Sequence, residues 1–162
     1  MKVGFGFDVH RLKEGRKFCL GGIEIPHTKG AEGHSDADVL IHALCDALLG
    51  AANLGDIGFH FPDNASEYKD IDSKILLKRV CILLKKNNFK IGNIDTTICL
   101  EKPKIAEYIP AMKKALSYVM EIDESSISIK ATTNERLGFI GNEEGISCYA
   151  IVLIESIDSW SN

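Results

Sequence analysis

The sequence lacks several features that would assign it to a familiar class. It has no apolar run approaching the roughly 18–20 residues that span a membrane, and no secretory signal. It has no basic excess, since 19 lysines and arginines face 23 acids for a net charge of −4. This balance argues against nucleic acid as a main partner but leaves open a phosphorylated small molecule. With no internal repeat and no linker, we expect one domain over residues 1–162.

Paired cysteines are missing as well. The five cysteines are an odd number, stand far apart without a CxxC pair, and mostly have apolar neighbours. We therefore expect reduced, buried thiols and no structural zinc site of the paired-ligand kind. A strand pattern that begins close to Met1 leaves no room for a transit peptide, so we expect a cytoplasmic protein.

What is present is a succession of clear strand and helix patterns. The predicted strands are Val3–His10, Ile91–Leu100, Ile127–Thr133 and Gly145–Ser156, with a hairpin over Phe18–Ile25 that turns at Gly21 and Gly22. The predicted helices run from Ser35 or Asp36 to about Ala52, from Ser73 to about Asn87 and from Ala106 to about Met120, with loops at Pro26–Gly33 and Gly50–Ser73. This order favours an α+β fold, with a four-stranded mixed sheet, helices on one face and a small β-hairpin.

The last predicted strand carries a hint of assembly. From Cys148 to Ile154 its side chains are almost continuously apolar, which is typical of a strand buried on both faces. Helices cover only one face of the predicted sheet. We therefore expect an oligomer in which the other faces pack together.

Asp8 and His10 form the sharpest local pattern. Residues i and i+2 of a strand point to the same side, so this carboxylate and this imidazole converge. Both groups suit zinc, and His42 on the polar stripe of the first helix could complete a site with one open position, as in catalytic zinc centres. Asp38 and Asp46 lie one helical turn before and after His42. Either carboxylate could orient the imidazole without itself binding the metal. The alternative is an exposed acid and an ordinary strand-edge histidine.

Other polar segments have two interpretations each. His34, Ser35 and Asp36 precede a helix, where they could cradle a phosphate or simply cap the helix. Ala131–Glu135 follows a strand and could bind phosphate oxygens and a hard cation, although polar strand ends are common. Asp56–Gly58 and Phe61–Asp63 have the composition of ordinary turns.

Taken in order, the motifs of this chain resemble those of the cyclodiphosphate synthase family of the non-mevalonate isoprenoid pathway. The resemblance covers nearly the whole chain with hardly any gaps, and the ordered set is far more specific than any one motif. Its motifs are GFDVH at Gly6–His10, the hairpin and Ile-Pro at Gly21–Pro26, HSDADV at His34–Val39, HALCDALLGA at His42–Ala51, LGDIG at Leu54–Gly58, FPD at Phe61–Asp63, GNID at Gly92–Asp95, KATTNERLGF at Lys130–Phe139 and GNEEGISC at Gly141–Cys148.

The resemblance implies two metal ions and two further catalytic positions. Asp8, His10 and His42 match zinc ligands. Glu135 matches the ligand of a second divalent ion, magnesium or manganese, that sits between the substrate phosphates. His34 and Thr133 match positions that stabilise the transition state.

The resemblance also implies a substrate and its pocket. The reaction closes a cyclic diphosphate by attack of the 2-phosphate of 4-diphosphocytidyl-methylerythritol 2-phosphate on the β-phosphorus, with release of CMP. Ser35 and the loop Phe61–Ala65 match contacts to the methylerythritol phosphate, and Asp56–Gly58 match contacts to the ribose. Leu100–Ala106 with Thr132 match a cytosine and diphosphate pocket from a neighbouring subunit. The full set of positions implied to bind substrate is Asp8, His10, His34, Ser35, Asp56, Ile57, Gly58, Phe61, Pro62, Asp63, Asn64, Ala65, Leu100, Glu101, Lys102, Pro103, Lys104, Ile105, Ala106, Thr132, Thr133, Asn134, Glu135, Phe139 and Asn142.

The family further implies a homotrimer with its sheets around a threefold axis and active sites between subunits. Several members bind isoprenoid diphosphates in an apolar axial cavity, where an arginine meets the diphosphate. Here Asn142 stands in place of that arginine and Tyr149 in place of a glutamate, so we expect weak binding of such ligands. Glu101–Pro103 also departs from the usual residues before the Pro-Lys pair, although backbone contacts to a base tolerate that.

Two other functions fit parts of the pattern. A zinc-dependent phosphohydrolase would use metal-bound water as its nucleophile and yield a linear product. A non-catalytic trimeric scaffold with structural zinc would need a fourth protein ligand.

Overall fold

The computed structural model describes residues 1–62, 68 and 70–157. Its main sheet has five strands in the order β4-β1-β7-β5-β6, and a separate two-stranded sheet forms the hairpin. The strands are β1 (Lys2–Glu14), β2 (Phe18–Leu20), β3 (Ile23–Ile25), β4 (Lys29–Glu32), β5 (Phe89–Cys99), β6 (Ile127–Thr132) and β7 (Gly145–Ser156). Only β5 and β6 are parallel, so the predicted mixed sheet is confirmed.

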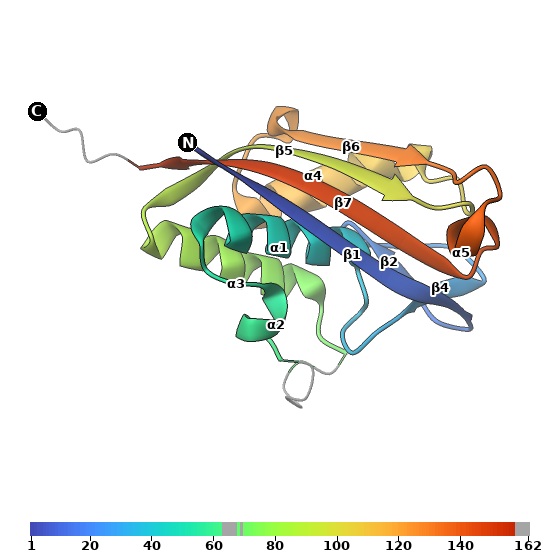
Figure 1. Ribbon diagram of the computed structural model, residues 1–162. Helices are drawn as coiled ribbons and strands as arrows, with labels where there is room; N and C mark the ends of the chain where they lie inside the picture. Colours follow the sequence, from blue (N-terminus) through green and yellow to red (C-terminus); the bar gives the residue numbers. More distant parts are fainter. Residues whose placement is uncertain (63–67, 69, 158–162) are drawn as a thin grey trace, which may run out of the picture.

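The helices are α1 (Val39–Ala52), α2 (Ile57–His60), α3 (Ser73–Lys86), α4 (Ile109–Met120) and α5 (Gly138–Gly141), with short 3₁₀ turns η2 (Ala106–Tyr108) and η3 (Glu124–Ser126). Figure 1 shows α1, α3 and α4 on one face of the sheet, as predicted, with α2 and α5 beside two of the loops. The β2–β3 hairpin turns at Gly21 and Gly22, whose φ angles of 61° and 79° favour glycine.

The predicted number of sheet strands was too low by one. β4 pairs with the far end of β1, from Arg11 to Glu14, beyond the predicted limit of that strand. The sequence of β4, Lys29-Gly-Ala-Glu32, contains a glycine and no β-branched residue, so no local strand signal marks it. Its pairing with an unusually long β1 makes it a strand.

The start of the first helix was also placed too early. Asp38 is the N-cap, with its side chain accepting a hydrogen bond from the backbone N–H of Ile41, and α1 begins at Val39. Ser35 and Asp36 precede the cap and make other contacts. Within the predicted Gly50–Ser73 loop the chain forms α2, while residues 63–67 and 69 of that loop lie outside the described part.

Two glycines of β1 set the distance between the sheet and α1. A Cβ atom on Gly4 would lie 1.9 Å from the carbonyl oxygen of Ala47, and one on Gly6 would lie 2.0 Å from that of Ala43. No side chain fits there, so the helix backbone lies directly on the strand. Gly4 and Gly6 share a face with Asp8 and His10, and the close approach therefore brings the start of α1 to those two side chains.

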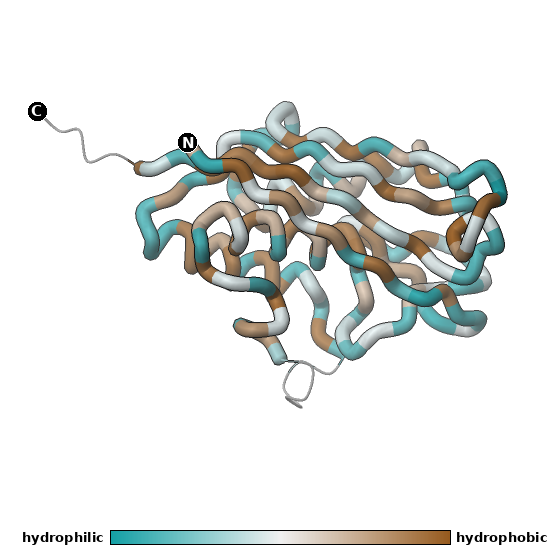
Figure 2. Tube along the Cα trace, viewed as in Figure 1, coloured by the Kyte–Doolittle hydropathy of each residue, from teal (hydrophilic) through white to brown (hydrophobic). Residues whose placement is uncertain are grey.

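The opposite face of the sheet carries exposed apolar side chains. On β1, Val3 and Phe5 are 68% and 62% exposed, and on β7 Ile151 is 51% exposed. Tyr149 lies on the same face with its ring 5.0 Å from that of Phe7. Figure 2 shows hydrophobic positions interspersed with hydrophilic ones along β1 and β7. The helix-facing residues of β7 are buried, so this strand is apolar on both sides, as the sequence indicated.

All five cysteines are free thiols, as predicted. Cys45, Cys81 and Cys148 are buried as expected, whereas Cys19 and Cys99 are only partly buried. Burial raises the pKa of Cys81 to about 11, so its reactive thiolate form is scarce at neutral pH. Among the described residues, no helix combines the length and apolarity needed to traverse a bilayer.

Candidate metal centre

Asp8, His10 and His42 meet at one point between β1 and the first turn of α1. The Oδ2 atom of Asp8 lies 3.0 Å from Nε2 of His10 and 3.1 Å from Nδ1 of His42, and the two nitrogens are 3.1 Å apart. Zinc takes such ligands at about 2.0–2.1 Å in tetrahedral geometry, which separates them by about 3.3 Å. The three atoms therefore form a group that could hold a metal ion.

Hydrogen bonds to the outer ring atoms orient both imidazoles for this purpose. Nδ1 of His10 lies 3.0 Å from the carbonyl oxygen of Glu32, which can only accept, so Nδ1 carries the hydrogen and Nε2 presents a lone pair. The outer nitrogen of His42, Nε2, lies 3.0 Å from Oγ of Ser73 and 3.1 Å from Oγ of Ser35. Three electron-pair donors face one another, and a cation satisfies all three together.

The charges of the site agree with this donor set. Burial alone would raise the pKa of Asp8, but its close contacts with the imidazoles of His10 and His42 outweigh burial and lower the pKa to about 2. For His10, burial acts to lower the pKa, while the Asp8 carboxylate more than compensates and raises it. A proton between these two residues can thus take the place of the cation, and metal binding would release it.

The predicted support of His42 by Asp38 or Asp46 does not match the contacts among the described residues. The two carboxylate oxygens of Asp38 accept hydrogen bonds from the backbone N–H groups of Gly21 and Gly22. Asp46 accepts from the backbone N–H of Ile57 and so fixes the start of α2. Both acids accept from backbone donors because Asp38 lies against the hairpin turn and Asp46 lies against the start of α2. Ser73 and Ser35 contact His42 instead.

A cavity of about 250 Å³ adjoins the three ligands. Besides Asp8 and His10, five residues predicted to act on substrate line it, namely His34, Ser35, Ile57, Gly58 and Phe61. Asp56 lies next to them as the N-cap of α2. Tyr68 and Leu76 also line the cavity and were not predicted, because an aromatic and an aliphatic residue carry no chemical signal in a sequence. Of the remaining predicted loop residues, Asp63, Asn64 and Ala65 lie outside the described part.

The second set of predicted residues forms a separate cluster at the end of β5 and β6. The backbone N–H of Leu100 donates to the carbonyl of Thr132, and the backbone N–H of Asn134 donates to Oε2 of Glu101. Oγ1 of Thr133 donates to Oε1 of Glu135 at 3.2 Å. The segments Leu100–Ala106 and Thr132–Glu135 are therefore neighbours, as the resemblance requires of one pocket.

The structure does not bring this cluster to the metal centre within one chain. Cross-strand pairing aligns Asp8 with Cys148 on β7, Cys148 with Ile98 on β5, and Ile98 with Ala131 on β6. Since neighbouring strands lie about 4.8 Å apart, Asp8 and Ala131 are separated by roughly 14 Å. Phe139 lines a separate hollow together with Val9 and His10. Asn142 is the C-cap of α5, and neither Phe139 nor Asn142 lines the cavity beside the three ligands.

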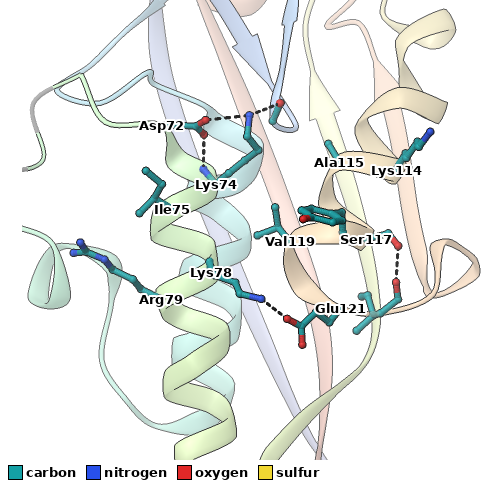
Figure 3. A pocket seen from close by; sticks show the side chains of 13 residues that line it. Asp72, Lys74, Ile75, Lys78, Arg79, Lys114, Ala115, Ser117, Val119 and Glu121 are labelled. Atoms are coloured by element: carbon teal, nitrogen blue, oxygen red, sulfur yellow. Dashed lines mark hydrogen bonds and ion pairs between the residues drawn. The ribbon is translucent and has the colours of Figure 1, made fainter.

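A larger hollow, of about 1150 Å³, lies between α3 and α4, away from all the predicted site residues. Figure 3 shows that its charged side chains are largely paired with each other: Lys78 with Glu121, and Lys74 with Asp72. Most of its lining surface is apolar, although six of its thirteen lining residues are charged. The smaller hollow is the one that adjoins Asp8, whose pKa is lowered, and the two imidazoles that converge on it. The chemistry of its side chains, and not its size, identifies it as the candidate site.

Comparison with known proteins decides the family. A model of the YgbB family matches residues 1–155. The chain belongs to the YgbB family. This YgbB chain is 64% identical over 157 residues to a 2-C-methyl-D-erythritol 2,4-cyclodiphosphate synthase of Bacteroides fragilis, a match covering 97% of the chain and 99% of the relative. The synthase of Bacteroides thetaiotaomicron is 63% identical over 96% of the chain and 98% of the relative.

Solved structures agree with the YgbB assignment. The bifunctional IspDF from Campylobacter jejuni has a TM-score of 0.93 at 41% identity. That match covers 97% of this chain but 42% of the longer protein. IspF from Plasmodium falciparum, solved as a CDP complex, has a TM-score of 0.85 at 36% identity and 97% coverage of both chains.

Proposed function

We propose that this chain converts 4-diphosphocytidyl-2-C-methyl-D-erythritol 2-phosphate into 2-C-methyl-D-erythritol 2,4-cyclodiphosphate and CMP, a step in isoprenoid precursor synthesis. The observation that carries the proposal is the Asp8–His10–His42 triangle in a chain that is 64% identical to a synthase of this name. The same three residues stand on the strand and helix where the family motifs predict them.

The reaction balances without any protein nucleophile. An oxygen of the 2-phosphate forms a bond to the β-phosphorus, the bond from that phosphorus to the bridging oxygen breaks, and CMP leaves with the electron pair. One anion attacks another, so the demands are neutralised charge and an in-line arrangement of both ends. Zinc at the triangle and magnesium or manganese at Glu135 would draw charge from the two phosphates when bound.

The chain's own residues divide the remaining tasks. His34 and Ser35 stand over the metal centre, where they can donate to phosphate oxygens and hold the 2-phosphate near its target. Thr133 in the second cluster can stabilise the charge that develops at the β-phosphate. Asp56–Gly58 grip the ribose, and Leu100–Ala106 bind the cytosine and diphosphate. The small cavity at the triangle limits the space for water that would compete with the 2-phosphate.

Incubation of the protein with zinc, magnesium and the cytidyl substrate tests the reaction. We expect a cyclic diphosphate and one equivalent of CMP. Release of CMP together with the linear 2,4-bisphosphate would instead identify a hydrolase with metal-bound water as nucleophile, and no turnover with a fully loaded metal would support a scaffold.

We propose further that three chains form a trimer whose active sites combine two subunits. Asp8 and Ala131 are aligned across the sheet but lie roughly 14 Å apart, which supports this proposal. Residues so far apart cannot contact the same phosphates within one chain. The exposed apolar face of β1 and β7 supports it as well, since exposed apolar patches of this kind mark protein interfaces. Residues 1–162 act as one domain in this arrangement.

A charge on the apolar sheet face should break the assembly. Phe5→Glu, at a side chain 62% exposed in the single chain, is expected to yield monomers and to lose activity, because a carboxylate would be buried without a partner. Tyr118→Glu on the helical side, 85% exposed, is the matched control and should remain trimeric and active. Sedimentation velocity distinguishes the two. An active monomer would contradict the shared site.

Mixing two inactive variants extends this test. Lys104→Ala removes a residue of the cytidine pocket and His42→Ala removes a metal ligand, so each homotrimer is expected to be inactive. After subunit exchange, some interfaces join an intact pocket to an intact metal centre, and part of the activity should return. No recovery despite proven exchange would place both halves in one subunit.

Isoprenoid diphosphates are expected to bind this trimer only weakly. Asn142 offers a neutral amide where family members place an arginine, and charged hydrogen bonds are roughly twice as strong as neutral ones. We expect Asn142→Arg to tighten binding of farnesyl diphosphate, measured by calorimetry, with Asn87→Arg at the end of α3 as the control for added charge. Tight binding by the unaltered protein, or no gain from the arginine, would show that the apolar tail dominates.

A further inference from the structure

Three side chains form a chain of hydrogen bonds behind the metal centre. Oγ of Ser73 lies 2.5 Å from Oδ1 of Asp36 and 3.0 Å from Nε2 of His42. The other nitrogen of His42, Nδ1, faces Asp8 at 3.1 Å. Asp36 and Ser73 are thus linked to the metal centre although neither can reach the metal position itself.

The direction of each hydrogen bond follows from counting hydrogens. A carboxylate only accepts, so the single hydroxyl hydrogen of Ser73 points to Asp36. Towards His42 the Ser73 oxygen can therefore only accept, and Nε2 of His42 must carry a hydrogen. The proton of the neutral imidazole is then on Nε2, which leaves the lone pair on Nδ1, the atom that faces Asp8 and His10.

The position of Ser73 is fixed from several sides. Ser73 is fully buried, and its backbone N–H donates to Oδ2 of Asp36 at 3.1 Å, so the same carboxylate holds both its hydroxyl and its backbone. The backbone N–H of Asp36 donates to the carbonyl of Ile71, which ties the loop before α1 to the start of α3. A charge-assisted bond of 2.5 Å to a buried serine leaves little freedom to reverse the hydroxyl.

We propose that Asp36 and Ser73 are positioning residues that set the tautomer and ring orientation of His42 and so make it a metal ligand. The proposal rests on the metal centre of the proposed function and deepens it, since the ligands alone do not explain why Nδ1 rather than Nε2 faces the ion. Ser35 also contacts Nε2 of His42 at 3.1 Å, but its oxygen accepts from the backbone N–H of Ala37 and has no carboxylate to fix its hydrogen.

Zinc affinity, measured by competition with a chromophoric chelator, tests the proposal without recourse to turnover. Ser73→Ala and Asp36→Ala are each expected to raise the Kd for zinc by about 10–100-fold, the usual effect of removing a partner of a metal-bound histidine. Asp36→Asn keeps an oxygen that can accept from Ser73 and should lose less. Because Asp36 acts through Ser73, the double variant should lose little more than either single variant.

Asp72→Ala is the matched control. Asp72 caps the same helix end, accepting from the backbone N–H of Lys74 at 2.9 Å, but does not touch Ser73 Oγ or His42 through any bond in the described structure. Its loss should lower the melting temperature and leave zinc affinity within threefold of the unaltered protein. The visible spectrum of bound Co²⁺, which reports ligand geometry, should change in Ser73→Ala and stay the same in Asp72→Ala.

The possible results distinguish a failure of the positioning role from a failure of the proposed metal centre. Zinc affinity within threefold of the unaltered protein in both Ser73→Ala and Asp36→Ala would overturn the positioning role, and so would an equal loss in Asp72→Ala. If the unaltered protein failed to bind zinc at all, the proposed metal centre itself would fall, and the positioning role with it.

Discussion

Replacing His42 with alanine is expected to abolish turnover and leave the chain folded. Two ligands remain after the substitution, and Asp8 with His10 alone offers a poor site for zinc. Metal ions supply several kcal/mol of charge stabilisation in such reactions, so the rate should fall on the order of 10³-fold or more. Zinc content and turnover, measured on the same preparation with zinc strictly controlled, provide the check.

The fold should survive because His42 is a polar side chain of the site rather than part of the core. It is only partly buried, it lies inside α1, and alanine favours the helix. Ser73 keeps its bond to Asp36 when the imidazole is gone. His27→Ala, at a histidine in the loop between β3 and β4, is the control and should retain zinc and activity. An unchanged rate in His42→Ala would refute the assignment of the ligands.

The part of the site that could be predicted is the part that secondary structure fixes. Asp8 and His10 share a face of β1 because strand residues alternate, and this needs no knowledge of the rest of the fold. The meeting with His42 required the close packing of α1 on Gly4 and Gly6. The polar stripe of the helix made His42 a candidate ligand, and the family resemblance selected it. Two glycines in a strand indicate that some backbone approaches closely, but they do not identify which one.

Contacts between distant segments were beyond the sequence. Ser73 lies 31 residues after His42 and looked like an ordinary first residue of a helix. Asp38 and Asp46 looked better placed, one helical turn away from His42. Their carboxylates instead accept hydrogen bonds from backbone N–H groups at the hairpin turn and at the start of α2. A buried N–H group without an acceptor would cost folding free energy. Helical spacing predicts which side chains are near, and the unpaired donors around them decide where they point.

The strand count was wrong for a similar reason. β4 contains Gly30, at which a Cβ atom would lie 2.0 Å from the carbonyl of Lys17, so the residue that weakens the local strand signal is required by packing. The pairing partner, Arg11–Glu14, is itself an extension with little apolar character. Neither segment predicts a strand alone, and each becomes one because the other satisfies its backbone hydrogen bonds.

The two clusters of predicted site residues hold the candidate ligands of two different metal ions. The triangle at β1 and the carboxylate after β6 lie on opposite sides of β7 and β5 within one chain. In the proposed mechanism, zinc and the second ion therefore have separate protein ligands. The two ions should be separable by mutation even though the proposed substrate would bring them together.

Glu135→Gln is expected to lower turnover at a fixed magnesium concentration by at least about 100-fold while zinc stays bound, because an amide is a much weaker ligand than a carboxylate for a hard cation. The shape of the side chain is unchanged, and glutamine can still accept the hydrogen bond that Thr133 donates at 3.2 Å. Raising the magnesium concentration should restore part of the rate, since affinity and not geometry is lost. Glu124→Gln, at an exposed acid in η3, should leave the magnesium dependence unchanged. Loss of zinc together with magnesium dependence would mean that Glu135 belongs to the zinc site, and the allocation of ligands between the two ions would have to be reversed.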